Sequence, residues 1–173
     1  PSPSAWAQIY FENTREPSSI ANAIIRYGGF QSRANYGNSM ISIRHAEVSI
    51  DNVVIEQAFA NGIYAGEGAK IIINNSLVQD NGQEEGNQAG VAIDEQAETE
   101  IKNTRFVNND YGIRSSSPRA DIEDNLFIGN RASAIYLSLH PGITINNDGY
   151  GNARNGIVFS SSRFSTQDLN SAD

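Results

Sequence analysis

Cysteine is absent from the 173 residues of this chain. Its absence excludes disulfide bonds and every metal site built on thiolates, and it leaves the redox compartment open. Lysine is almost as scarce, with only Lys70 and Lys102, and the formal net charge is -8. Because a phosphate-binding surface needs clustered lysine and arginine, this composition argues against nucleic acid as a partner.

Long apolar runs are missing as well. No stretch approaches about 18 consecutive apolar residues, so we expect no insertion into a membrane. The opening Pro1-Ser2-Pro3-Ser4 lacks the basic start and apolar run of a signal peptide, which is typical of a mature protein or an excised domain. The apolar residues recur periodically instead of being rare, and this pattern predicts a folded domain.

A short motif repeats six times along the chain. Each copy has an isoleucine, an Asn or Asp two residues later and a large apolar residue five residues later. Successive isoleucines are 21 to 30 residues apart, a spacing close to one coil of a β-solenoid. The copies are Ile20-Asn22-Ile25, Ile50-Asn52-Ile55, Ile73-Asn75-Val78, Ile101-Asn103-Phe106, Ile122-Asp124-Phe127 and Ile145-Asn147-Tyr150.

Three short strands are predicted in each coil. Residues around the repeat isoleucine alternate between apolar and polar, as in Val48-Ser49-Ile50, which is typical of a half-buried strand. A first strand such as Gly62-Ile63-Tyr64 precedes it, and a third strand such as Val53-Val54-Ile55 follows it. Three strands and three turns in each coil predict a triangular parallel β-helix.

The Asn or Asp of each motif is predicted to form a ladder. Equivalent positions in stacked coils lie about 4.8 Å apart, so side-chain amides can hydrogen-bond from coil to coil. Asn and Asp also suit the tight corner that the chain must turn there. A second, partial ladder is expected eight residues after the isoleucine, at Asn81, Asn109 and Asn130. The first ladder comprises Asn22, Asn52, Asn75, Asn103, Asp124 and Asn147.

Charged residues support this stacking. The residues three positions before the isoleucine are Glu47, Lys70, Glu98 and Arg119 in successive coils. Neighbouring strands then present opposite charges to each other. The register that produces this alternation is therefore the expected one.

These segments resemble a known family. The Gly-Ile-Tyr strand followed by Ile-x-Asn-x-x-Phe and Asn-Asn is similar to the right-handed parallel β-helix repeats of the pectin-lyase-like superfamily. The opening Trp6-x-x-Ile9-x-Phe11 resembles the first coils of bacterial extracellular proteins of that kind, and the likeness extends to Phe159. It implies an all-β, single-stranded right-handed parallel β-helix of about six to seven coils. This domain is expected over residues 1–159, with residues 160–173 as a linker or light cap.

The catalytic signatures of that superfamily do not occur in the chain. Polygalacturonases carry Asn-Thr-Asp, Asp-Asp, Gly-His-Gly and Arg-Ile-Lys strings, whereas Asn103-Thr104 continues to Arg105 here. The Trp-Ile-Asp-His string of pectate lyases is missing at the single tryptophan, Trp6, and the Asp-Pro-His string of alginate epimerases is missing too. These departures argue against catalysis of those types.

One face of the solenoid carries the candidate binding residues. Two insertions, Phe30–Ser39 and Gly82–Ala89, both enter a first strand and so flank the same face, which is frequently the binding face of a solenoid. The alternative is that they are tolerated surface loops. The outward residues of that face are Ser42, Tyr64, Ala92, Arg114, Tyr136 and Val158.

Tyr64 and Tyr136 are candidates to stack on sugar rings, with Arg114 between them to bind a carboxylate or hydroxyl. The alternative is that tyrosine is simply favoured in strands. Asp94 and Glu95 follow the next strand and complete the candidate carbohydrate site. Glu84, Glu85 and Asp94 are also candidate ligands for Ca²⁺, although no regular Asp-x-Asp spacing supports a calcium loop.

Three functions remain open on sequence grounds. The favoured one is an extracellular or cell-surface bacterial module that binds a polysaccharide or is displayed on it, without intact catalysis. The second is a divergent polysaccharide lyase, hydrolase or epimerase, with Arg114 and Tyr136 as base and proton donor and Asp94 or Glu95 on a metal. The third is a structural spacer that belongs to a longer surface protein with further domains.

A stripe of apolar residues has two interpretations. Ile24, Val54, Leu77 and Leu126 stand four positions after their isoleucines, and Arg105 interrupts the series. If the flanking residues point inward, the stripe is exposed and suggests a partner or a covering segment. If the third strand twists, the stripe belongs to the core.

Overall fold

The computed structural model describes residues 2, 5–29, 38–82, 86–138, 144–153 and 155–160. These residues form strands and turns, and within them no helix is long and apolar enough to cross a membrane. The predicted tail, residues 160–173, lies outside the described residues except for Ser160.

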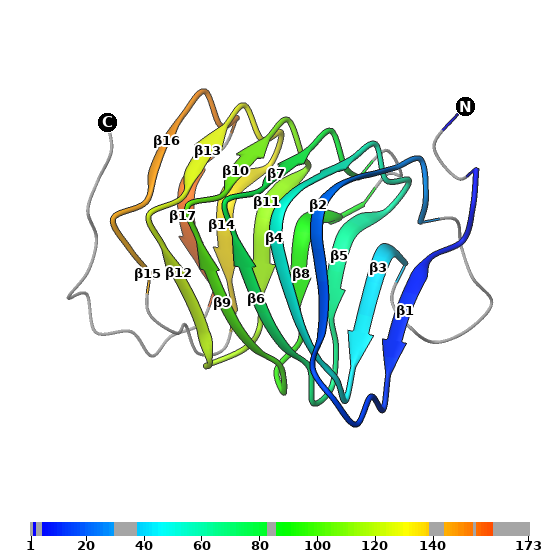
Figure 1. Cartoon of the computed structure of the whole chain (residues 1–173). Coiled ribbons are helices and arrows are strands. Elements are labelled where there is room, and N and C mark those ends of the chain that lie inside the picture. The colour runs from blue at the N-terminus through cyan, green and yellow to red at the C-terminus, as the bar shows by residue number, and fades with distance from the viewer. Residues whose placement is uncertain are drawn as a thin grey trace.

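Seven first strands form one parallel sheet, here called the first-strand sheet. Each strand pairs with the first strand of the next coil, so the sheet runs along the solenoid (Figure 1). The strands are β1 (Ile9–Glu12), β3 (Ser39–Arg44), β5 (Asn61–Ala65), β8 (Ala89–Ile93), β11 (Tyr111–Ser115), β14 (Ser133–Leu137) and β17 (Asn155–Phe159).

The second and third strands of each coil form the other, ten-stranded sheet. In the first two coils one long strand bends through the corner, and in later coils the corner separates two short strands. The strands are β2 (Ser18–Arg26), β4 (Glu47–Glu56), β6 (Lys70–Asn74), β7 (Leu77–Gln79), β9 (Glu98–Lys102), β10 (Arg105–Val107), β12 (Ala120–Glu123), β13 (Leu126–Ile128), β15 (Thr144–Ile145) and β16 (Asp148–Tyr150).

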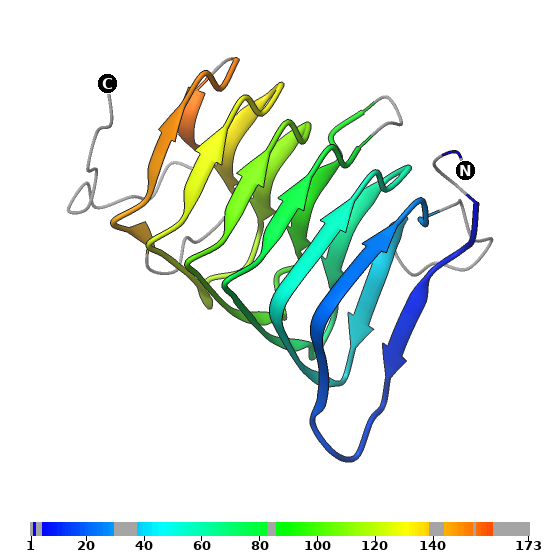
Figure 2. The same ribbon diagram turned by 45° about the horizontal axis from the view of Figure 1, so that its top comes forward.

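The coils stack in sequence order from one end of the solenoid to the other (Figures 1 and 2). Within the described residues, six coils with second and third strands are followed by β17, the first strand of a seventh. Every strand pair is parallel, as in the pairing of β5 with β8. The prediction of an all-β parallel solenoid of six to seven coils is therefore confirmed.

Alternation of inward and outward side chains builds the core. Equivalent inward residues stack into columns, so that Ile50, Ile73 and Ile101 follow one another in register and are fully buried. In the third strands Phe106 and Phe127 stack with their ring centroids 4.9 Å apart. The core is a continuous apolar column, and each coil is stabilised by its two neighbours.

The charge alternation lies in the expected register. Glu47 is paired with Lys70, and Lys70 with Glu98. Lys70 Nζ lies 3.5 Å from Glu47 Oε1. Such exposed ion pairs contribute only about 0–1 kcal/mol each to the free energy of folding. Their main effect is to favour this strand register over a shifted one.

In each coil an Asn or Asp turns the corner between the second and third strands. Its backbone is left-handed, with φ between 49° and 54°, a conformation that Asn and Asp tolerate better than other residues with a Cβ. These side chains are exposed, and amide contacts between coils occur at Asn52 Nδ2 to Asn22 Oδ1, 2.7 Å, and Asn75 Nδ2 to Asp51 Oδ1, 2.9 Å. The corner residues are Asn22, Asn52, Asn75, Asn103, Asp124 and Asn146.

The sixth corner therefore differs from the prediction, which assigned it to Asn147. Ile122 pairs with Thr144, and Glu123 with Ile145, so the last motif is shifted by one residue. Asn146 has a φ of 51° and turns the corner, whereas the Asn147 side chain accepts hydrogen bonds from Asn125. The motif places its Asn two residues after Ile145, at Asn147, whereas the strand pairing and the left-handed backbone place the corner at Asn146.

The principal amide ladder is buried at the corner after the third strand. Asn81 Nδ2 donates to Asn109 Oδ1 at 3.0 Å, Asn109 Nδ2 to Asn130 Oδ1 at 3.2 Å and Asn130 Nδ2 to Asn152 Oδ1 at 2.9 Å. Each Oδ1 also accepts the backbone N–H of the preceding asparagine. The buried amide contacts thus belong to the second ladder that the sequence predicted, at Asn81, Asn109 and Asn130. Asn152 extends this ladder by one coil.

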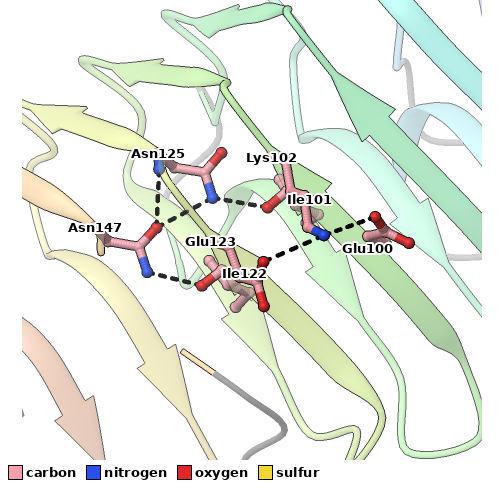
Figure 3. A network of polar contacts seen from close by, with 7 residues as sticks. All are labelled: Glu100, Ile101, Lys102, Ile122, Glu123, Asn125 and Asn147. Carbon is pink, nitrogen blue, oxygen red and sulfur yellow. Dashed lines mark hydrogen bonds and ion pairs between the residues drawn. The ribbon is translucent and has the colours of Figure 1, made fainter. Parts of the chain in front are cut away.

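A second set of inward side chains stabilises the corner before the third strand. Asn125 donates to Asn147 Oδ1 through both its N–H and Nδ2 at 3.1 Å, and to the Ile101 carbonyl at 2.8 Å (Figure 3). Thr104 and Ser76 occupy the same position in earlier coils, where their hydroxyls accept backbone N–H groups. Buried backbone donors are therefore satisfied by side chains wherever the chain bends.

The apolar stripe faces outward. Val53 and Ile55 are buried on either side of Val54, so the +4 residue of each third strand points to solvent. Ile24 is 61% exposed, and on the same face Tyr150 is 59% exposed. The interpretation of the stripe as core is therefore wrong.

Candidate functional site

The outward residues of the first-strand sheet form one continuous row. Strand pairing puts Tyr64 beside Ala92, Ala92 beside Arg114 and Arg114 beside Tyr136. The row therefore runs parallel to the solenoid axis. Its members are Tyr10, Ser42, Tyr64, Ala92, Arg114, Tyr136 and Val158.

A cleft of about 210 Å³ opens on this row. It lies where the small side chain of Ala92 separates Tyr64 from Arg114. Hydroxyl, amide, carboxylate and guanidinium groups converge on it. The lining residues are Asn61, Tyr64, Ala92, Ile93, Asp94, Arg114, Ser115, Ser116 and Ser138.

One wall of the cleft is a hydrogen-bonded pair. The Tyr64 hydroxyl donates to Asp94 Oδ2 at 2.9 Å, and Asp94 Oδ1 accepts the N–H of Glu95 at 2.8 Å. Gly66 leaves room for the ring, because a Cβ there would stand 2.8 Å from Tyr64 Cε1. Burial and the hydrogen bond to Asp94 raise the pKa of Tyr64 to about 12, so this phenol is protonated at neutral pH.

The opposite wall carries a cation. Arg114 is exposed, and its Nη1 donates to the Asn87 carbonyl at 2.9 Å. Among the described residues it has no carboxylate partner. Beside it Tyr111 and Tyr136 meet edge to face with ring centroids 5.6 Å apart. The guanidinium is thus held by a neutral carbonyl and keeps donors for a ligand.

Three of the five candidate carbohydrate-binding residues line the same cleft. Tyr64, Asp94 and Arg114 converge there, and Tyr136 follows Arg114 in register but does not line the cleft. Glu95 is exposed in the turn after β8 and also lies outside the cleft lining. Glu95 contacts Asp94 through its backbone N–H and not through its carboxylate.

Other residues of the site had no signal in the repeat. Tyr111 stands before the Gly-Ile pair of its strand, and its hydroxyl donates to Asn87 Oδ1 at 3.4 Å. Ser116 and Ser138 follow their strands in the turn position of Asp94. The residue after the first strand is polar in four successive coils, at Asp94, Ser116, Ser138 and Ser160. This recurrence is the sequence feature that points to the serines.

The described residues contain no group of three or more His, Asp and Glu side chains that could hold a metal ion. Both oxygens of Asp94 already accept hydrogen bonds. Glu84 and Glu85, the other candidate calcium ligands, lie outside the described residues.

A separate ionic cluster lies on the second strands. Lys102 Nζ lies 3.0 Å from Glu100 Oε1 and 3.2 Å from Glu123 Oε2 (Figure 3). Hydrogen bonds to Glu100 and Glu123 raise the pKa of Lys102. Lys102 thus links two neighbouring coils.

The raised pKa of Tyr64 has a measurable consequence. We expect the difference between the wild-type and Tyr64→Phe alkaline absorbance titrations to have its midpoint near 12 rather than at the usual 10.0. Since the folded state binds this proton more tightly than the unfolded state, Tyr64 stabilises the fold fully below pH 10 and loses that contribution as the pH rises to about 12. Circular dichroism of the same samples identifies the folded range, within which a midpoint near 10 would contradict the buried hydrogen bond.

Stacked parallel coils with inward amide ladders define a β-solenoid. Comparison with known proteins shows the family to which this chain belongs. A family model described as a right-handed β-helix region matches residues 7–172. This match covers nearly the whole chain, and the chain belongs to the right-handed β-helix family. Searches among curated proteins and among solved structures gave no match.

Proposed function

We propose that this chain is an extracellular bacterial module of the pectin-lyase-like kind that binds a polysaccharide along its first-strand sheet. The observation that carries the proposal is the cleft in which Tyr64, Asp94 and Arg114 converge. A sugar presents an apolar face and a rim of hydroxyls, and aromatic rings beside polar groups are complementary to both. Ala92 provides the space between them.

The direction of the row suits a linear polymer. Tyr64 and Tyr136 are three coils apart in register, which corresponds to about 14 Å at the spacing of parallel strands. A polysaccharide that lies along the solenoid axis therefore meets Tyr64, the cleft and Tyr136 in turn. Ser116 and Ser138 present hydroxyls along the same path.

The chemistry of the cleft favours binding over proton transfer. The pKa of about 12 keeps Tyr64 protonated, and arginine side chains are not deprotonated in proteins. A general base must be able to accept a proton near neutral pH. The divergent enzyme that the sequence left open, with Arg114 and Tyr136 as base and proton donor, has no support from these contacts.

Retention on immobilised polysaccharides tests the proposal. We expect the wild type to be retained by at least one polymer of a panel, and the Tyr64→Ala/Tyr136→Ala double variant to bind at least about tenfold more weakly, because each stacked ring contributes about 1 kcal/mol or more. Tyr150→Ala is the matched control, since Tyr150 is exposed on the other sheet. Equal losses in both variants would contradict the site, whereas unsaturated sugar ends released by the wild type would favour a lyase.

A further inference from the structure

The loop between Gly82 and Ala89 leaves the solenoid beside the proposed binding face. The chain departs just after Asn81 of the buried ladder and returns at the start of β8. Gly82 has a φ of +81°, a left-handed conformation that glycine adopts without strain. At the other end the Ala89 N–H donates to Asn61 Oδ1 at 2.8 Å, and Asn61 lines the cleft. The described ends of this loop are therefore connected to the ligand site.

An arginine from two coils further on holds the departing end. Arg131 Nη2 donates to the Gly82 carbonyl at 2.6 Å, with the Asn81 carbonyl 3.5 Å away. The two partners are 49 residues apart in sequence, so the side chain of Arg131 extends across the whole intervening coil. Arg131 does not line the cleft. A charged donor on a backbone carbonyl makes a strong hydrogen bond.

The returning end is held by a second arginine. Arg114 Nη1 donates to the Asn87 carbonyl at 2.9 Å, and the Tyr111 hydroxyl approaches Asn87 Oδ1 at 3.4 Å. Unlike Arg131, Arg114 also lines the cleft. The position of Asn87 therefore determines where one nitrogen of this guanidinium lies, and hence where its remaining donors point.

We infer that Arg131 is a positioning residue for the cleft. Gly82 lies against Gln88, since a Cβ at Gly82 would stand 3.0 Å from Gln88 Cβ. By holding Gly82, Arg131 therefore fixes the neighbouring Asn87, whose carbonyl meets Arg114 and orients its guanidinium before a ligand arrives. An arginine side chain loses rotamer entropy when a ligand fixes it, and orientation in the free protein reduces that loss on binding. This inference rests on the proposed function, because the benefit of an oriented Arg114 is affinity for a ligand in the cleft.

The Arg131→Gln variant tests the inference through two independent measurements. Hydrogen exchange at the Gly82 and Ala89 amides reports on the loop, since both amides donate hydrogen bonds. The dissociation constant for a polysaccharide that retains the wild type reports on the cleft. We expect faster exchange at both amides and about tenfold weaker binding, the equivalent of one charge-assisted hydrogen bond, with unchanged exchange in the core strands.

The matched control is Arg119→Gln. Arg119 is exposed, and its Nη2 donates to the Gln96 carbonyl at 2.8 Å, which is the same kind of contact in a turn outside the cleft. We expect wild-type exchange at Gly82 and Ala89 and wild-type affinity in this control. Arg114→Gln is expected to lose at least as much affinity as Arg131→Gln.

The outcomes separate this inference from the proposed function. Unchanged exchange at Gly82 and Ala89 in Arg131→Gln would overturn the loop attachment. Faster exchange with unchanged affinity would overturn the positioning role while leaving the binding site in place. If the wild type is retained by no polysaccharide, the proposed function fails and the positioning role falls with it, whereas exchange still establishes or refutes the attachment of the loop.

Discussion

Replacement of Asn109 with leucine is expected to lower the free energy of unfolding by about 4 kcal/mol, because it leaves several buried polar groups without partners. Asn109 Oδ1 accepts the N–H of Asn81 at 3.1 Å and its Nδ2 at 3.0 Å. Asn109 Nδ2 donates to the Val78 carbonyl at 2.9 Å and to Asn130 Oδ1 at 3.2 Å. Leucine has a similar size but cannot replace any of these four contacts.

Chemical denaturation of Asn109→Leu measures this loss. Asn74→Leu is the control. Asn74 is partly exposed, and it accepts the hydrogen bond from the Ser76 hydroxyl through its backbone carbonyl, which the substitution leaves in place. We expect Asn74→Leu to remain within about 0.5 kcal/mol of the wild type. A similar small effect in Asn109→Leu would mean that the buried ladder does not stabilise the solenoid.

Replacement of Gly112 with alanine is expected to destabilise the protein by about 2–3 kcal/mol through overpacking. An added Cβ would stand 2.5 Å from the Ala134 carbonyl oxygen and 2.6 Å from Phe127 Cδ1. The carbonyl belongs to the backbone of the next coil, whose strand pairing limits its movement. Relief of the contact therefore requires the two coils to separate locally.

The same row of the sheet provides a matched control for Gly112→Ala. Gly156 occupies the equivalent position in β17, and an added Cβ there meets nothing within 4 Å. Thermal unfolding of Gly156→Ala is expected to resemble that of the wild type. If both substitutions lower the unfolding temperature equally, the contact with the next coil is not the cause.

The repeat predicted the fold because one physical constraint acts in every coil. Inward positions must be apolar to fill the column, and a shift by one residue would turn each strand inside out. For this reason the row that contains Tyr64, Ala92 and Arg114 was predicted from the sequence in its correct register. The assignment failed at Asn147, because the last coil is shifted by one residue: Thr144 pairs with Ile122, and the adjacent Asn146 turns the corner.

The candidate site was predictable in part for the same reason. Tyr64, Asp94 and Arg114 occupy periodic positions at or just after the first strands, so their proximity follows from the stacking. Asn87 and Arg131 lie in turns, and their contacts join residues that are 27 and 49 positions apart. Long side chains that reach across coils are not constrained by the repeat, and the sequence gives no indication of their partners.

Nuclear magnetic resonance of the folded protein during titration with oligosaccharides from a retained polymer tests the central claim most directly. The account predicts that amide shifts change at Ala92, Arg114 and Ser116, which line the cleft. It also predicts that Ile128 and Tyr150, on the outward side of the third strands, are unaffected. Shift changes at Ile128 and Tyr150 with none at the cleft would contradict it, because they would place the ligand on the outward face of the third strands instead.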